Sequence, residues 1–129
     1  MTDRIGIVEP AWKMILSNKA ILAVLWEMFP GHPNLLAASR ERAAIPGPCV
    51  EKPIYGREGK DVRLVAAGDP GRGHRGQVYQ ALAPLPVFDG WHALIGSWVV
   101  AGRAGGIGLR EDRDPVTRNT SRFVPHYFR

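Results

Sequence analysis

Apolar residues near the start of the chain recur with the spacing of a helix. Between Asn18 and Phe29 they stand three and four positions apart, at Ile21, Leu22, Val24, Leu25, Met28 and Phe29. This stripe predicts an amphipathic helix that is capped by Ser17 or Asn18 and stopped by Pro30–Gly31. Because proline is tolerated in a first helical turn, residues 33–38 are expected to form a second, shorter helix.

Beyond the polar, proline-rich segment 40–48 the apolar period changes to two. Short, often β-branched runs are separated by turn residues and occupy positions 50–54, 62–65, 77–82, 93–101 and 106–109. Such runs predict strands, and the short loops between them favour antiparallel pairing. Turns are expected at Gly56–Gly59 and at Asp69-Pro70-Gly71. The pattern as a whole predicts an α+β fold in which an antiparallel sheet follows two leading helices.

Composition narrows the class of protein. The 129 residues fit one domain, and 45% hydrophobic with 22% charged residues is ordinary for a folded chain. The longest apolar stretch, residues 20–29, is interrupted by Glu27 and is shorter than the roughly 20 residues that span a bilayer. Residues 1–13 carry no signal-peptide pattern, and the single cysteine, Cys49, has no internal disulfide partner. A cytoplasmic protein without membrane association is expected.

The net charge of +5 raises the question of nucleic acid as a partner. The 17 basic residues are spread among 12 acidic ones, and the densest group, Arg72, His74 and Arg75, lies in a glycine-rich loop. Nucleic-acid-binding domains carry a clustered basic stripe, which this sequence lacks. A solvated basic surface is the favoured interpretation, and a nucleic-acid-binding domain is kept as a minor alternative that predicts strongly salt-dependent affinity.

One short segment suggests phosphate chemistry without reference to any family. Lys52 lies at the end of a predicted strand, directly before a loop that holds Gly56 and Gly59. An ammonium group forms charge-assisted hydrogen bonds with phosphate, and glycines allow backbone amides to approach an anion. The same pattern also describes an ordinary turn. The four histidines are scattered without metal-ligand spacing, and neither a P-loop nor a G-x-S-x-G motif occurs.

Six ordered segments resemble the glutathionylspermidine-synthase-like ATP-grasp family, and together they cover nearly the whole chain from Glu9 onward. They are EPAWKMILSNKAIL (9–22), LWEMFPGHPNLL (25–36), EKPIYGREGKDV (51–62), VYQALAPLPVFDG (78–90), IGSWVVAGRAGGIGLRED (95–112) and NTSRFVPHY (119–127). The resemblance implies an ATP-dependent ligase that joins a carboxylate to an amine through an acyl phosphate. Two features depart from the family pattern: segment 37–49 fits poorly, and Ala23 stands where the family commonly has proline.

The resemblance also implies roles for individual residues. Lys19, in the S-N-K-A-I motif, and Lys52, in the K-P motif, would contact nucleotide phosphates. Gly56, Arg57 and Gly59 would belong to a glycine-rich lid over those phosphates. Such a lid would exclude water from the hydrolysable acyl phosphate.

Two further sites follow from the same resemblance. Gln80, Ala81 and Leu82 match the hinge segment that contacts the adenine. Arg110 matches the catalytic arginine near the transferred phosphate, where a cation stabilises charge in the transition state. ATP and Mg²⁺ are the expected cofactors. No metal ligand is assigned within this chain, because the family's magnesium ligands lie upstream of the matching segments.

The domain organisation expected from the resemblance is a single partial ATP-grasp domain over residues 1–129. It comprises an amino-terminal segment (1–17), helices and a loop (18–48), a lid hairpin (49–76), and a hinge with carboxy-terminal strands (77–129). Such a fragment is expected to be inactive alone, with ATP and an upstream half or a homologous full-length chain as partners. The alternative is a non-catalytic nucleotide-binding or interaction module that complements a separate upstream half.

Overall fold

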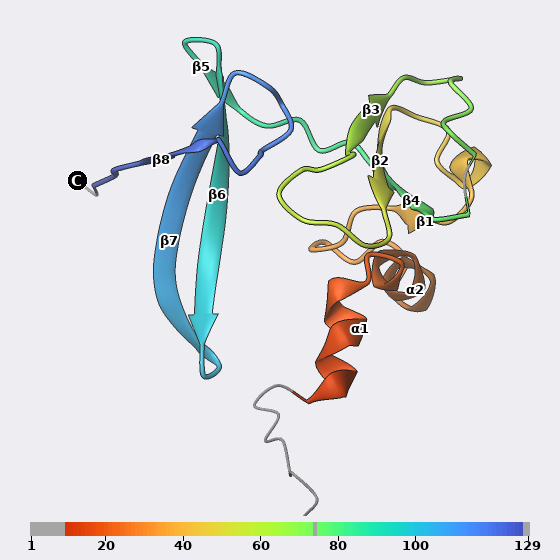
Figure 1. Ribbon diagram of the computed structural model, residues 1–129, viewed down its shortest axis with the longest axis horizontal. Helices are drawn as coiled ribbons and strands as arrows, with labels where there is room; N and C mark the ends of the chain where they lie inside the picture. The colour runs from red at the N-terminus through yellow and green to blue at the C-terminus, as the bar shows by residue number, and fades with distance from the viewer. Residues whose placement is uncertain (1–9, 74, 128–129) are drawn as a thin grey trace, which may run out of the picture.

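The computed structural model describes residues 10–73 and 75–127, and its elements form two separate antiparallel sheets with a few short helices (Figure 1). The helical elements are η1 (Ala11–Lys13), α1 (Met14–Ser17), α2 (Ile21–Met28) and η2 (Arg42–Ala44). The strands are β1 (Ala38–Ser39), β2 (Cys49–Pro53), β3 (Arg63–Val65), β4 (Gln77–Ala81), β5 (Val87–Phe88), β6 (Trp91–Val100), β7 (Arg103–Asp112) and β8 (Arg122–Val124). The chain is therefore a mixed α/β protein, consistent with the α+β class.

The first sheet has the strand order β1-β4-β2-β3 and carries the buried core. Strand β2 pairs with both β3 and β4, which places Glu51 opposite Arg63 on one side and Tyr79 on the other. The core on this face consists of Ile45, Cys49, Val65 and Tyr79, each at most 5% exposed. Alternation along β2 turns Lys52 toward the opposite face of the sheet.

A buried carboxylate lies within this core face. Glu51 is fully buried, and its Oε2 accepts hydrogen bonds from Arg63 Nε at 3.2 Å and Nη2 at 3.0 Å. The Arg72 backbone N–H donates to the same oxygen at 3.3 Å. The bond to Glu51, together with nearby Asp69, raises the pKa of Arg63 above its ordinary value. Buried charges are tolerated when they are paired in this way, so the ion pair ties β3 and the loop after it to β2.

The second sheet has the order β5-β6-β7-β8 and is dominated by the long β6–β7 hairpin. Two-residue turns close both of its hairpins, at Asp89–Gly90 and at Ala101–Gly102, and all four residues have positive φ. Positive φ at both central positions is the type I′ geometry, which matches the twist of paired strands. Near the second turn the register shifts between Trp98 and Val99, which leaves Gly105 of β7 without an opposite residue, as in a β-bulge.

The two sheets meet at a contact between loops. A Cβ placed on Gly59, in the β2–β3 loop, would lie 2.5 Å from the carbonyl oxygen of Thr117 and 3.1 Å from Val116 Cγ1, both in the β7–β8 loop. The backbones of these loops therefore approach more closely than any side chain would allow. This approach brings the glycine-bearing loop of the first sheet against the second sheet.

The predicted helix over residues 18–29 is confirmed as α2. The helix itself begins at Ile21, and no side chain caps it at Ala20; Asn18, one of the two expected caps, accepts the Ala20 backbone N–H with its Oδ1 at 2.9 Å in the preceding turn. The short α1 was not predicted, because Met14, Ile15 and Leu16 are consecutive apolar residues that give no helical stripe. All three are more than half exposed.

The predicted second helix over residues 33–38 is wrong. Turns occupy residues 30–31 and 33–34, and the chain then extends so that Ala38 pairs with Gln80 and the Ala81 N–H donates to Ala37 O at 2.7 Å. Pairing with the edge of β4 satisfies more backbone groups than a one-turn helix would. The expected strands all form, but in two sheets rather than one. No helix in the described part of the chain is long and apolar enough to cross a bilayer.

Candidate functional site

Lys19 reaches the loop after β2 from the corner between α1 and α2. Its backbone N–H donates to Ile54 O at 2.9 Å, and its ammonium donates to Gly56 O. The preceding residue strengthens the attachment, because Asn18 Nδ2 donates to the Tyr55 hydroxyl at 3.2 Å. Three bonds thus hold the Lys19 ammonium over the loop that contains Gly56 and Gly59, which we call the glycine loop (residues 56–59).

Lys52 approaches the same region from the sheet. Its Nζ donates to Gln80 Oε1 at 2.7 Å, and the register pairs Lys52 with Val78, so Gln80 lies two residues further along the same face of β4. Burial lowers the pKa of Lys52 below its ordinary value of 10.5, and the charge of nearby Lys19 lowers it further. The two ammonium groups therefore lie close enough to repel each other.

Neither ammonium has an acidic partner in the part of the chain that the structure describes. Within the described residues, Lys19 and Lys52 form hydrogen bonds only with neutral oxygens, and no ion pair includes either of them. Each ammonium has three donors, so each retains two for a ligand. Two close cations without an anion form an arrangement that an anionic ligand would stabilise.

A cleft of about 560 Å³ opens beside Lys19 and the glycine loop. Its lining residues come from the end of α1 and from the loop itself, namely Leu16, Ser17, Lys19, Tyr55, Gly56 and Arg57. Arg57 adds a second cationic side chain to this lining, and its backbone carbonyl accepts the Lys60 N–H at 3.1 Å within the loop. The cleft is thus bordered by positive charge and by a backbone that the glycines leave uncovered.

Backbone hydrogen bonds to two other segments of the chain hold residues 80–82 in place. The Ala81 N–H donates to Ala37 O at 2.7 Å and the Leu82 N–H donates to Pro48 O at 3.1 Å. A purine base at this segment could not use these two donors without displacing those bonds. The Gln80 side chain points toward Lys52, so the structure brings together two residues that the sequence assigned to different ends of ATP.

Arg110 lies on β7, away from the lysine pair. Its Nη2 donates to Ser121 O at 3.1 Å and to Arg118 O, and its guanidinium stacks 5.1 Å from the centre of the Phe123 ring. None of its bonds found in the described residues reaches Lys19 or Lys52. Its buried Nε has no hydrogen-bond partner in the same residues. Arg110 therefore shapes the β7–β8 loop, the loop that contacts Gly59.

A larger cleft, about 750 Å³, lies elsewhere on the first sheet, near Arg40, Arg42 and Arg75. This cleft is larger, but the groups that line it are less suited to binding a ligand. Arg42 donates to four backbone carbonyls, those of Ile45, Gly47, Ala66 and Asp69, so its donors are already used in holding loops together. The smaller cleft has unused cationic donors and is the better candidate for a ligand site.

The family is shown by comparison with known proteins. The profile described as glutathionylspermidine synthase pre-ATP-grasp matches residues 1–129, which is the whole chain. The chain belongs to this family. The resemblance seen in the sequence motifs is thereby confirmed at the level of the glutathionylspermidine synthase family.

The curated proteins to which this chain is similar are ligases or synthetases by name. A protein of Haemophilus influenzae, provisionally named an acid–amine ligase, is 47% identical over 142 residues that cover 98% of this chain and 36% of the relative. Trypanothione synthetase of Crithidia fasciculata is 39% identical, with 90% of this chain and 19% of the relative covered. The bifunctional glutathionylspermidine synthetase/amidase of Escherichia coli is 34% identical, with 92% and 21% covered. The chain thus spans about a third or less of these relatives.

Two residues that the sequence analysis did not assign to a ligand site belong to the candidate site. Tyr55 lines the cleft and accepts the bond from Asn18, and Asn18 itself fixes the corner that presents Lys19. The available signal was position, because Tyr55 immediately precedes Gly56 and Asn18 immediately precedes Lys19. Chain neighbours of a predicted ligand residue are candidates for holding it in place.

Proposed function

We propose that this chain is the carboxy-terminal, nucleotide-handling ATP-grasp portion of a ligase that uses ATP to join a carboxylate to an amine. The observation that carries the proposal is a pair of neighbouring ammonium groups, Lys19 and Lys52, that have no acidic partner among the described residues. Lys19 lines the cleft and bonds to the glycine loop, and its charge lowers the pKa of Lys52. Polyphosphate is the anion that such an arrangement suits, because it offers several charged oxygens to donors that lie side by side.

The glycine loop acts in this proposal as a lid over the phosphates. Its backbone carries few side chains that would obstruct an anion, and Lys19 is already bonded to it at Gly56. The contact of Gly59 with Thr117 limits how far the loop can open without losing packing against the second sheet. Arg57 lies on the cleft wall, where its guanidinium would add positive charge opposite the lysines.

The adenine and the transferred phosphate are assigned on the family resemblance. Gln80, Ala81 and Leu82 would contact the base, and the bond from Lys52 to Gln80 would couple that contact to the phosphates. Arg110 would stabilise charge on the transferred phosphate, which requires its guanidinium to turn from the carbonyls of Arg118 and Ser121.

The residues present do not fit a resident magnesium ion. In residues 10–73 and 75–127 there is no group of three or more His, Cys, Asp or Glu side chains placed to hold a metal. In phosphoryl transfer a metal neutralises charge between the β- and γ-phosphates. Its ligands would have to come from another part of the ligase, so this chain alone is proposed to bind nucleotide weakly and not to turn it over.

Thermal unfolding in increasing Mg-ATP tests the proposal. A ligand at one hundred times its Kd stabilises a folded chain by about 2.7 kcal/mol, so a rise in Tm that saturates is expected. Lys52→Ala removes one of the two converging ammonium groups and should abolish the rise. Lys60→Ala, which removes an exposed lysine just after the glycine loop, is the matched control and should retain it.

Three outcomes count against the proposal. If the folded chain shows no rise in Tm, Lys19 and Lys52 do not form a nucleotide site. The same conclusion follows if Lys52→Ala and Lys60→Ala reduce the rise equally. Amine-dependent release of phosphate by the chain alone contradicts its proposed inactivity.

A further inference from the structure

Strand β6 is apolar along nearly its whole length, which is unusual for a strand with a wet face. Its sequence WHALIGSWVV shows no alternation of polar and apolar residues after His92. Continuous apolar runs are typical of strands that are covered on both faces, whereas strands with one wet face alternate. In the structure, however, Ile95, Trp98 and Val99 are 63%, 62% and 69% exposed.

Both faces of the β6–β7 hairpin carry this exposed apolar surface. On one face Ile95 lies opposite Leu109, and Ile107 follows two residues away on β7. On the other face Trp98 lies opposite Gly106, where the glycine leaves its indole without a side-chain neighbour across the pair. Figure 1 shows no helix on either face of the hairpin, whose far half stands apart from the remaining described elements.

The strand edges of the hairpin are also open. Strand β5 pairs only with Trp91 and His92, and β8 pairs only with residues 109–111 of β7. The Ala93 N–H still donates to Pro86 O at 2.9 Å, but among the described residues nothing pairs with the outer edge of β6 from Leu94 onward or of β7 before Leu109. Unpaired strand edges offer rows of backbone donors and acceptors to another strand. No described residue outside the hairpin thus pairs with the edges of its far half, residues 95–107, or covers its faces.

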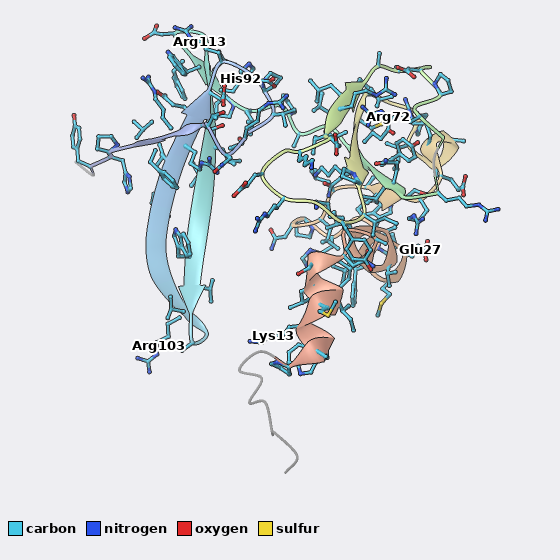
Figure 2. All side chains as sticks on the ribbon, viewed as in Figure 1. Lys13, Glu27, Arg72, His92, Arg103 and Arg113 are labelled. Carbon is cyan, nitrogen blue, oxygen red and sulfur yellow. The ribbon has the colours of Figure 1, made fainter. Side chains whose placement is uncertain are left out.

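Polar and charged side chains lie at the two ends of this apolar surface, and no charged side chain of the described residues lies within it. Figure 2 shows Arg103 at the tip of the hairpin and His92 and Arg113 at the opposite end, with the apolar stretch between them. A hairpin in water is marginal when no face of it is buried, and apolar surface rimmed by polar groups marks an interaction site. The hairpin has the composition of the inner pair of a larger sheet.

We propose that residues 95–107 dock against the region of the full-length relatives that this chain does not match. In the complex that region adds a strand to the edge of the hairpin and covers both of its faces. The unmatched part is large, because the chain covers only 36% of the Haemophilus influenzae relative and 19% of the Crithidia fasciculata synthetase. A second copy of this chain fits less well. Face-to-face pairing of two hairpins buries one face of each and leaves the other face of each in water.

Co-expression tests the docking without any nucleotide, so its result is independent of the proposed ATP binding. The tagged 129-residue chain is produced together with the Haemophilus influenzae relative from which the matched region has been deleted. A one-to-one complex is expected on size exclusion. Ile95→Asp and Trp98→Asp, one on each face, should each lower the recovered partner at least tenfold. Leu64→Asp is the control, since Leu64 is an exposed apolar residue on β3 of the other sheet, 41% exposed.

Amide hydrogen exchange separates loss of docking from loss of folding. The amides of β2 and β4 should exchange at the same rate in the hairpin variants as in the original chain, and the amides from Leu94 to Val100 that face the open edge should slow at least tenfold in the complex. Absence of a complex overturns the proposal, as does equal loss with Leu64→Asp. Concentration-dependent dimers of the chain alone that both hairpin substitutions abolish would identify a second copy as the occupant instead.

Discussion

The ammonium of Lys52 and the side-chain carbonyl of Gln80 lie 2.7 Å apart, although 28 residues separate them in the chain. The contact arises because β2 pairs directly with β4, which sets the two residues on one face and two positions out of register. The opposite face of β2 is occupied by buried Glu51 and its partner Arg63. Strand β2 therefore carries a structural ion pair on one face and, on the other, a cation for which residues 10–73 and 75–127 supply no acidic partner.

The lowered pKa of Lys52 predicts how nucleotide affinity changes with pH. Burial first, and then the charge of Lys19, favours the neutral amine, so Lys52 loses its proton below the ordinary value of 10.5. A phosphate ligand favours the charged form, so affinity should be full at low pH and should fall as pH rises through the lowered pKa. Binding measured from pH 8 to 10, where phosphate is fully ionised, should therefore weaken progressively.

Lys52→Arg is the matched variant for that measurement. A guanidinium remains charged throughout this range, so the variant should bind ATP with little change between pH 8 and 10. An equal decline in both proteins would assign the pH dependence to another group and would remove Lys52 from the phosphate site.

The close approach of Gly59 and Thr117 predicts a costly substitution. Gly59 has a φ of +68°, and an added Cβ would lie 2.5 Å from a backbone oxygen that cannot move independently. Gly59→Ala should destabilise the chain in urea unfolding by about 1–2 kcal/mol from the left-handed backbone, with about 1–3 kcal/mol more from the clash.

Gly73→Ala separates those two contributions. Gly73 has a similar φ of +65°, and nothing lies within 4 Å of its added Cβ. It should therefore show the backbone cost alone. Equal losses for the two substitutions would mean that the glycine loop does not pack against the β7–β8 loop in solution.

Local periodicity explains which elements the sequence could predict. The helix at residues 21–28 follows from a spacing of 3.6 residues, and the strands β2, β3, β4, β6 and β7 follow from short apolar, often β-branched runs between turn residues. The short strands β5 and β8 were not predicted. The pairing of Ala38 with Gln80 could not be predicted in this way, because a two-residue strand has no period and forms only when a distant edge is present. The division into two sheets likewise depends on which strands pair, and that is a tertiary choice.

The candidate site shows the same division. Lys52 and the glycines could be singled out, because a lysine before a glycine loop is a local pattern. The full burial of Glu51 could not be predicted in this way, because it depends on pairing with Arg63 from the neighbouring strand. Tyr55 gained its place from a bond to Asn18 that no spacing rule foretells.

The turn between β6 and β7 predicts a stabilising substitution. Ala101 has a φ of +49° in a type I′ turn, a conformation that costs a residue with an ordinary Cβ about 1 kcal/mol or more. Asn-Gly is the preferred pair in such turns, so Ala101→Asn before Gly102 should stabilise the chain by about 1 kcal/mol in urea unfolding. Asp89→Asn is the control, because Asp89–Gly90 already suits the same turn. A gain for the control that equals the gain for Ala101→Asn would contradict the assigned strain.

The β7–β8 loop predicts sensitivity to acid. The hydrogen bond from the Ser121 hydroxyl, followed by the backbone N–H of Asp114, lowers the pKa of Asp112 below its ordinary value of 3.8. Because the folded state holds the charged carboxylate, its stabilising contribution is complete above the unfolded pKa and is lost as pH falls through the lower folded pKa. Urea midpoints measured from pH 6 to 2.5 should fall below about pH 4.

Asp112→Asn tests whether the Asp112 carboxylate causes this acid sensitivity. The amide oxygen can still accept one of the two bonds but cannot titrate, so the variant should be less stable at pH 6 and should lose less stability on acidification. Asp61→Asn, at an exposed aspartate whose side chain forms no hydrogen bond within the described residues, should follow the original chain across the range. If Asp112→Asn instead shows the full acid-dependent loss, another carboxylate is responsible and the bonds of Ser121 and Asp114 to Asp112 do not stabilise the loop in solution.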